Sequence, residues 1–142
     1  KGVFNVCRAF IPVMPTGGSM INIRSISGGV ADRSMTLCNA SKAFVHGLSR
    51  SIAVDHSPDL RCKVISPGWI ETGMLEADFN LATEPARASQ ATIDRHASLW
   101  SPQDIETMAT FLVSEEASFF NGQIFTMCGE LTATLPINPT LT

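Results

Sequence analysis

Short β-rich segments alternate with longer segments of helical period along this chain, and that alternation restricts its fold more than any other feature. Apolar residues recur every three or four positions in two segments, and a Ser-Pro pair opens a third, which predicts helices over residues 1–14, 36–55 and 102–113. Three β-rich segments lie between or after these helices, at residues 19–24, 60–66 and 123–128. Helices and strands in this order predict an α/β fold around a parallel sheet.

The predicted helices carry local signals for their boundaries and their buried faces. The first apolar stripe includes Phe4 and Phe10, and the second includes Phe44 and Val45. Each stripe gives its helix one apolar side, as in an amphipathic helix. Ser101 is a suitable N-cap for the third helix, since a serine oxygen can accept a hydrogen bond from the first helical turn.

The composition excludes several classes of protein. The 142 residues are 44% hydrophobic and 16% charged, which is typical of one globular domain. The net charge is −3 and no basic block is present, so nothing in the charge pattern favours binding to nucleic acid or to an anionic membrane. No apolar run is long enough to span a membrane. The four cysteines form no C-x-x-C pair and no histidine stands at metal-ligand spacing, so we expect reduced thiols, no metal site and a cytoplasmic protein.

Four short motifs follow one another in a fixed order. The first predicted strand runs into Ser25, Cys38 stands thirteen residues later, and Lys42 follows four residues after that within C-N-A-S-K. The second strand ends in S-P-G-W-I-E-T at 66–72, and N-G-Q at 121–123 leads into the third. This order and spacing resemble the second half of the classical short-chain dehydrogenases/reductases, over nearly all of the chain. In that family a tyrosine stands between the serine and the lysine, so Cys38 occupies the tyrosine position.

The resemblance implies a fold and a reaction. Residues 1–142 would form the C-terminal half of one Rossmann-like, doubly wound parallel sheet, and residues 73–98 would form its substrate loop. The reaction would move a hydride between NAD or NADP and a small-molecule carbonyl or alcohol substrate. Ser25, Cys38 and Lys42 would be the catalytic residues, with Ser25 bonding to the substrate oxygen. A serine that only caps a turn is the alternative for Ser25.

The resemblance also implies a cofactor site and a self-association surface. Lys42 would hold the nicotinamide ribose, and the turn containing Pro67, Gly68, Ile70 and Thr72 would contact the nicotinamide carboxamide. Gly68 would let the backbone approach the cofactor closely. Family members commonly pair through helices equivalent to residues 1–14 and 36–55, which implies a homo-dimer or tetramer.

Cys38 separates three possible functions. Its sulfur reaches about 4 Å less far than a tyrosine oxygen, whereas proton transfer needs contact near 3 Å or one bridging water. The chain contains no tyrosine that could take its place. The protein could therefore be an impaired oxidoreductase or a non-catalytic relative that acts as a partner or nucleotide-sensing subunit. It could also be a fragment without independent activity, because the chain begins at Lys1 and has no glycine-rich phosphate loop after a first strand.

Two polar residues beside these motifs have more than one possible role. Arg24 is a long cation where the family usually has a small residue. It would either point to the other face of the strand or obstruct the cofactor. His46 follows Lys42 by one helical turn, and would be either a proton relay or a histidine on the helix surface or at an interface.

Overall fold

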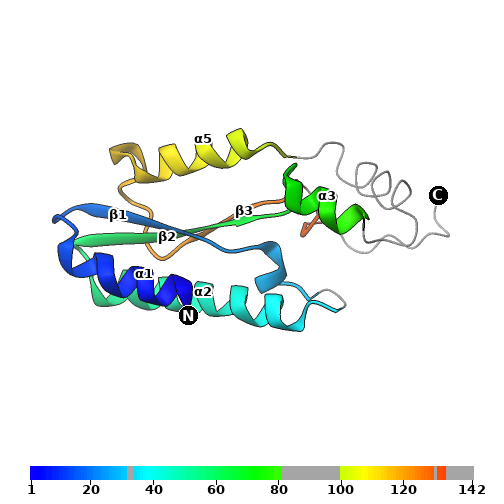
Figure 1. Ribbon diagram of the computed structural model, residues 1–142. Coiled ribbons are helices and arrows are strands. Elements are labelled where there is room, and N and C mark those ends of the chain that lie inside the picture. The colour runs from blue at the N-terminus through cyan, green and yellow to red at the C-terminus, as the bar shows by residue number, and fades with distance from the viewer. Residues whose placement is uncertain (32–33, 81–99, 130, 134–142) are drawn as a thin grey trace.

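The computed structural model describes residues 1–31, 34–80, 100–129 and 131–133. In chain order the elements are α1 (Gly2–Phe10), η1 (Ile11–Val13), β1 (Gly18–Ile23), η2 (Ile26–Gly28), α2 (Thr36–Asp55), β2 (Leu60–Pro67), α3 (Gly73–Asn80), α5 (Pro102–Val113), η3 (Glu115–Ala117) and β3 (Ile124–Met127), as Figure 1 shows. The η elements are short 3₁₀ helices. The predicted alternation of helices and strands is confirmed.

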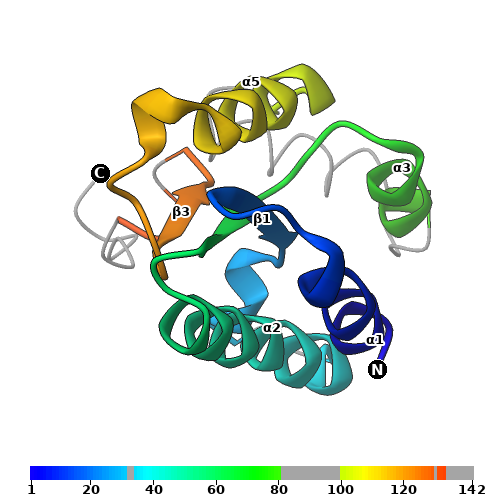
Figure 2. The same cartoon turned by 90° about the vertical axis from the view of Figure 1, so that its left-hand side faces the viewer.

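The three strands form one parallel sheet with β2 between β1 and β3. Gly18 lies opposite Leu60 at the start of the first pairing, and Val64 lies opposite Ile124 at the start of the second. Helices α1 and α2 cover one face of the sheet and α5 covers the other (Figures 1 and 2). As expected for a central strand between two helical layers, β2 is buried along almost its whole length.

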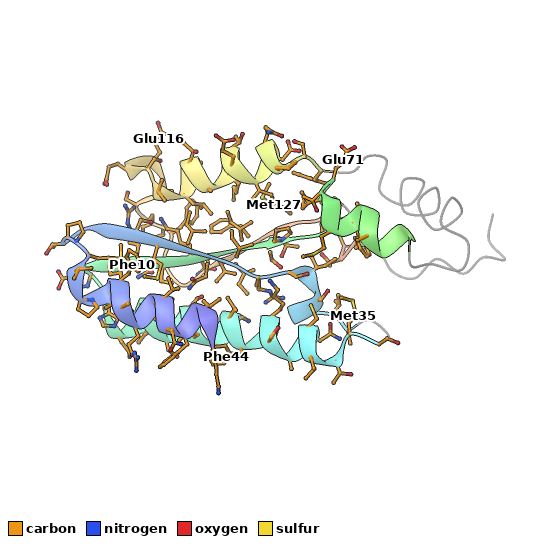
Figure 3. All side chains as sticks on the ribbon, in the orientation of Figure 1. Phe10, Met35, Phe44, Glu71, Glu116 and Met127 are labelled. Atoms are coloured by element: carbon orange, nitrogen blue, oxygen red, sulfur yellow. The ribbon has the colours of Figure 1, made fainter. Side chains whose placement is uncertain are left out.

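Each face of the sheet has its own apolar core. Between the sheet and helices α1 and α2 lie the buried side chains of Cys7, Ile52, Ala53, Leu60 and Cys62. Beneath α5 the buried residues are Ile65, Leu112 and Ala117, joined by an edge-to-face stack of three phenylalanines, Phe111, Phe120 and Phe125. These two cores hold the sheet between its helical layers, and Figure 3 shows their side chains as sticks.

The predicted apolar stripes are only partly buried. Val45 is buried, but Phe4, Phe10 and Phe44 expose 43%, 58% and 50% of their surface. Figure 3 shows Phe10 and Phe44 on the two helices that cover the lower face. Helices α1 and α2 therefore carry apolar residues on more of their circumference than the sheet covers.

Asn121 joins the start of β3 to the elements before it. Its side-chain oxygen accepts a hydrogen bond from the Cys62 amide at 2.8 Å, and its side-chain nitrogen donates to the Ala53 carbonyl at 3.3 Å. Gly122 also donates to the Cys62 carbonyl, at 2.8 Å. The predicted N-G-Q motif therefore fixes the entry of β3 beside β2 and α2.

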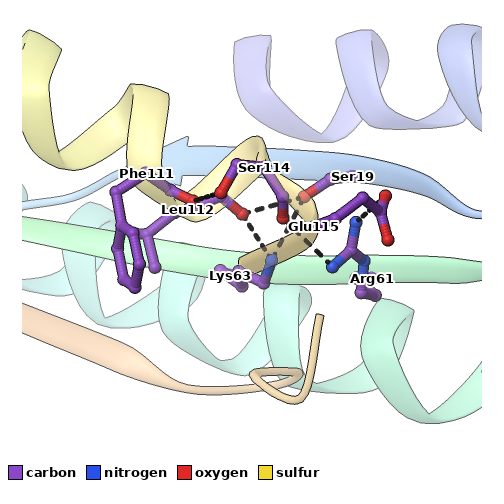
Figure 4. A network of polar contacts seen from close by, with 7 residues as sticks. All are labelled: Ser19, Arg61, Lys63, Phe111, Leu112, Ser114 and Glu115. Carbon is purple, nitrogen blue, oxygen red and sulfur yellow. Dashed lines mark hydrogen bonds and ion pairs between the residues drawn. The ribbon is translucent and has the colours of Figure 1, made fainter. Parts of the chain in front are cut away.

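A buried lysine, Lys63, joins the C-terminal end of α5 to the end of the sheet where β1 begins. This is the end of the sheet away from η2. Lys63 in β2 is fully buried, and its ammonium group donates to the Leu112 carbonyl and lies 3.4 Å from the Ser19 hydroxyl (Figure 4). Nearby, Arg61 pairs with the exposed carboxylate of Glu115 at 3.4 Å. The last carbonyls of a helix carry partial negative charge, so cations are favoured there. Burial nevertheless lowers the pKa of Lys63, and so does Arg61, while Glu115 opposes the shift.

Candidate active site

The predicted site residues lie at the carboxyl edge of the sheet or on elements that begin there. Ser25 follows the end of β1, and Pro67 is the last residue of β2. The N-terminal end of α2, with Cys38 and Lys42, and the start of α3 lie toward the same edge, on the right in Figure 1. In open α/β sheets this edge is where ligands bind.

Ser25 caps the turn that follows it. Its hydroxyl oxygen accepts a hydrogen bond from the Ser27 amide at 3.2 Å, and the two hydroxyl groups lie 3.3 Å apart. The Ser25 carbonyl accepts from the Gly28 amide at 3.0 Å, which closes the turn η2. The turn-capping alternative for Ser25 thus describes what the residue does in this structure. A hydroxyl can make further hydrogen bonds, so capping leaves room for a ligand.

The turn after Ser25 packs directly against the backbone of α2. A methyl group at Gly28 would lie 2.6 Å from the carbonyl carbon of Lys42 and 2.9 Å from the amide nitrogen of Ala43. Only glycine permits this approach, because no side-chain carbon fits at such distances. The structure therefore brings the Ser25 turn and the Lys42 segment together, and sequence spacing alone had not indicated the role of Gly28.

Cys38 and Lys42 lie one turn apart near the start of α2, the end of the helix close to Met35 in Figure 3. Cys38 is half-buried, whereas the other three cysteines, Cys7, Cys62 and Cys128, are buried. Lys42 is also half-buried, and within the described part of the chain its ammonium group has no hydrogen bond or ion pair. A partly buried ammonium without an acceptor is well suited to a ligand that supplies one.

The turn after β2 is fixed by β3. The Gly68 amide donates to the Met127 carbonyl at 2.8 Å, and a methyl group at Gly68 would lie 2.9 Å from both the α and β carbons of Cys128. The predicted reason for a glycine here was close approach to a cofactor. The packing of Cys128 is sufficient by itself to require glycine at this position.

A short backbone bridge follows this turn. Ile70 pairs with Trp100: the Glu71 amide donates to the Trp100 carbonyl at 2.9 Å, and the Trp100 amide lies 3.4 Å from the Trp69 carbonyl. The amide N–H of Ile70 itself has no partner among the described residues. Thr72 is exposed, and its hydroxyl lies 3.4 Å from the Ile70 carbonyl. The Ile70 N–H and the Thr72 hydroxyl thus lie two residues apart in the segment after β2.

The segment predicted to form the substrate loop, 73–98, begins with α3. The rest of that segment, 81–98, lies outside the described residues. The bridge between Ile70 and Trp100 joins the backbone on either side of the predicted loop.

Arg24 lies beneath the Ser25 turn. Its side chain is 6% exposed, and its Nε–H donates to the Ser25 carbonyl at 2.9 Å. A methyl group at Gly29 would lie 2.7 Å from the guanidinium group. The Arg24 side chain thus packs against the Ser25 turn. Burial lowers the pKa of Arg24 from its usual value.

His46 is half-buried on α2, within electrostatic range of Arg24. Burial lowers the pKa of His46, and the positive charges of Arg24 and Arg50 lower it further. His46 is therefore held in its neutral form beside the Arg24 guanidinium at neutral pH.

The described residues support neither a metal site nor a membrane-spanning helix. They contain no group of three His, Cys, Asp or Glu side chains placed to hold a metal ion. In the same part of the chain no helix has both the length and the apolar character needed to cross a membrane.

Comparison with known proteins gives a consistent set of relatives. A family model described as "Enoyl-(Acyl carrier protein) reductase" matches residues 1–132. The 7alpha-hydroxysteroid dehydrogenase of Bacteroides fragilis is 37% identical over 134 residues, which cover 92% of this chain and 49% of that protein. The NADP-dependent (R)-specific alcohol dehydrogenase of Lentilactobacillus kefiri is 35% identical over 120 residues, which cover 82% of this chain and 46% of that protein.

A solved structure has the same arrangement of elements. The ligand-free aldohexose dehydrogenase of Thermoplasma acidophilum superposes with a TM-score of 0.87 at 27% sequence identity, covering 96% of this chain and 57% of that one. The chain spans about half the length of the curated relatives it matches.

Proposed function

Because this chain belongs to the classical short-chain dehydrogenase/reductase family, we propose that it serves in an NAD(P)-dependent oxidoreductase acting on a carbonyl or alcohol, with proton transfer impaired at Cys38. The observation that carries the proposal is the packing of the Ser25 turn on the Lys42 backbone through Gly28. A residue that can bond a reacting oxygen and a residue that can hold a cofactor are thereby kept in one rigid unit.

The polar groups at the carboxyl edge fit a nicotinamide cofactor. The Lys42 ammonium and the Ile70 amide are donors without partners among the described residues, and the Thr72 hydroxyl, two residues after Ile70, is exposed. Lys42 would bond the ribose hydroxyls, while Ile70 and Thr72 would bond the carboxamide. A bound nicotinamide supplies or accepts the hydride. NADP dependence of the L. kefiri relative agrees with this cofactor class.

The remaining chemistry belongs to the side chains of this protein. The Ser25 hydroxyl donates a hydrogen bond to the substrate oxygen, where negative charge develops during reduction. For this it exchanges its contact with the Ser27 hydroxyl for one with the substrate. Lys42 carries its positive charge one helical turn from Cys38.

Proton transfer at Cys38 is the step that limits this mechanism. A proton must reach or leave the substrate oxygen, and the short thiol reaches it only through a bridging water. Such a water needs polar partners of its own. This geometry favours slow turnover, and it also favours a second candidate function, that of a relative that binds nucleotide without catalysis.

Nucleotide binding by the complete protein tests the proposal. Calorimetry with NADH and NADPH should detect binding of at least one, and Lys42→Met should weaken it about tenfold or more, the usual worth of a charged hydrogen bond. Arg50→Met is the matched control, since Arg50 is an exposed cation on the same helix. Absence of nucleotide binding, or equal loss in both variants, would contradict the proposed role of Lys42.

Self-association through α1 and α2 belongs to the same proposal. Both helices leave apolar side chains in solvent, including Val6 and Phe10 on α1 and Leu37 and Phe44 on α2. Burial of these residues against a second copy would remove an unfavourable exposed surface. Light scattering of the complete protein should give the mass of a dimer or tetramer, and Phe10→Glu with Phe44→Glu should shift it toward the monomer.

A further inference from the structure

Arg24 is a buried cation that forms no ion pair with a carboxylate of the described residues. Its side chain is 6% exposed, and within the described ranges no carboxylate forms an ion pair with it. His46 on α2 lies within electrostatic range of Arg24, and Arg50 on the same helix also acts on His46. Burying a charge without a partner is unfavourable, and the hydrogen bond from the Arg24 Nε–H to the Ser25 carbonyl offsets part of that cost.

The Ser25 carbonyl connects Arg24 to the turn. This oxygen accepts two hydrogen bonds, one from the Gly28 amide at 3.0 Å and one from the Arg24 Nε–H at 2.9 Å. The far end of the turn rests on the same side chain, since a methyl group at Gly29 would lie 2.7 Å from the guanidinium. Arg24 therefore contacts both ends of the turn.

The opposite side of the turn rests on α2. Gly28 packs on the carbonyl of Lys42, so the turn is held between the Arg24 guanidinium and the α2 backbone. The Ser25 hydroxyl takes its direction from the amide of Ser27, which lies inside this turn. Any movement of the turn would thus change the direction of the Ser25 hydroxyl relative to Lys42.

We propose that Arg24 is a positioning residue: by holding the Ser25 carbonyl and the underside of Gly29, it fixes the Ser25 hydroxyl in relation to Lys42. The inference rests on the proposed function for its catalytic meaning, whereas the clamp itself depends only on the contacts described. The long, charged side chain of Arg24 stands where the family usually has a small residue. It then supports the site structurally and does not obstruct it.

Amide hydrogen exchange of the complete protein tests the clamp without any need for activity. Arg24→Met keeps much of the apolar stem and removes the Nε–H donor. Exchange at Gly28 and Gly29 should become about tenfold faster or more, because local opening is governed by local contacts. The amide of Val64, which is bonded to the Gln123 carbonyl in the sheet, should be unchanged.

Arg50→Met is the matched control, since it removes a cation from α2 outside the clamp and should leave all of these exchange rates unchanged. Unchanged exchange at Gly28 and Gly29 in Arg24→Met would overturn the inference, and so would an equal increase at Val64. If Arg24→Met does not fold, Arg24→Gln provides the same test at the amides of Gly28 and Gly29. The glutamine side chain is shorter than arginine and cannot reach the turn in the same way.

A double-mutant cycle then tests whether Arg24 acts through Ser25. In the complete protein carrying Cys38→Tyr, Ser25→Ala should lower kcat about 100-fold, as loss of an oxyanion donor does. Arg24→Met should lower kcat about tenfold through loosened geometry while the KM for the nucleotide is kept. Added to Ser25→Ala, Arg24→Met should have no further effect on kcat, whereas additive losses would overturn the inference.

The two proposals fail in different ways. A complete protein that reduces no carbonyl, with or without Cys38→Tyr, would contradict the proposed function and leave the exchange measurement to decide the clamp. A protein that is active but shows no coupling between Arg24 and Ser25 would contradict the inference alone.

Discussion

Gly28 lies so close to Lys42 that a methyl group on it would stand 2.6 Å from the Lys42 carbonyl carbon. This contact joins the turn that begins at Ser25 to the helix that carries Cys38 and Lys42. The frame of the site is therefore fixed by backbone packing and does not depend on which side chain stands at position 38.

Gly28→Ala should destabilise the protein and disturb the site. Forcing a carbon into this contact should lower the free energy of unfolding by about 1–3 kcal/mol, the usual cost of overpacking. Gly47→Ala is the matched control, because nothing lies within 4 Å of a methyl group at that helical position. The control should gain up to about 1 kcal/mol from helix propensity. Urea unfolding of the complete protein measures both, and equal effects would refute the contact.

Cys38→Tyr should raise carbonyl reduction. A positioned general acid contributes at least about 100-fold, so kcat with NADH or NADPH and a ketone should rise by that factor or more in the complete protein. Cys38→Ser is the control: its hydroxyl is as short as the thiol, so turnover should stay low. No increase for Cys38→Tyr, despite retained nucleotide binding, would favour the non-catalytic relative instead.

The elements that could be predicted from sequence are those with local signals. Helix α2 was predicted over 36–55 and has those bounds. Helix α5 begins after Ser101, whose side chain and backbone form a capping box with Asp104. Helix capping and helical periodicity depend on residues only a few positions apart, so both can be recognised in the sequence.

The features that escaped prediction depend on contacts between distant segments. Which way Arg24 points was left open, because its direction follows from the packing of η2 on α2. The bridge between Ile70 and Trp100 joins residues thirty positions apart, and neither carries a spacing signal. Periodicity identifies the apolar stripe that contains Phe44 but not how much of that stripe the sheet covers, and half of the Phe44 surface is exposed.

Cys38 should be the first thiol to react with iodoacetamide in the native protein. Cys7, Cys62 and Cys128 are 2%, 0% and 6% exposed, whereas Cys38 is half-buried near the start of a helix. Burial also raises the pKa of Cys62 to about 11, so that thiol is almost wholly protonated at neutral pH. Mass spectrometry of the native complete protein should find that, among these four cysteines, Cys38 is labelled first. Labelling of Cys62 before Cys38 would contradict the packing of the core between the sheet and α1.

Lys63→Met should change how stability depends on pH. Burial lowers the pKa of Lys63 in the folded protein, whereas in the unfolded chain it is about 10.5. Between these two values the unfolded chain binds the extra proton, so the stability of the wild type rises with pH through this window and falls as pH drops through it. The difference in unfolding free energy between wild type and Lys63→Met should therefore shift in favour of the wild type as pH rises toward 10.5. Lys42→Met is the control, since Lys42 is only half-buried. Urea unfolding at a series of alkaline pH values measures the slope, and parallel slopes for wild type and Lys63→Met would show that the buried ammonium keeps its ordinary pKa.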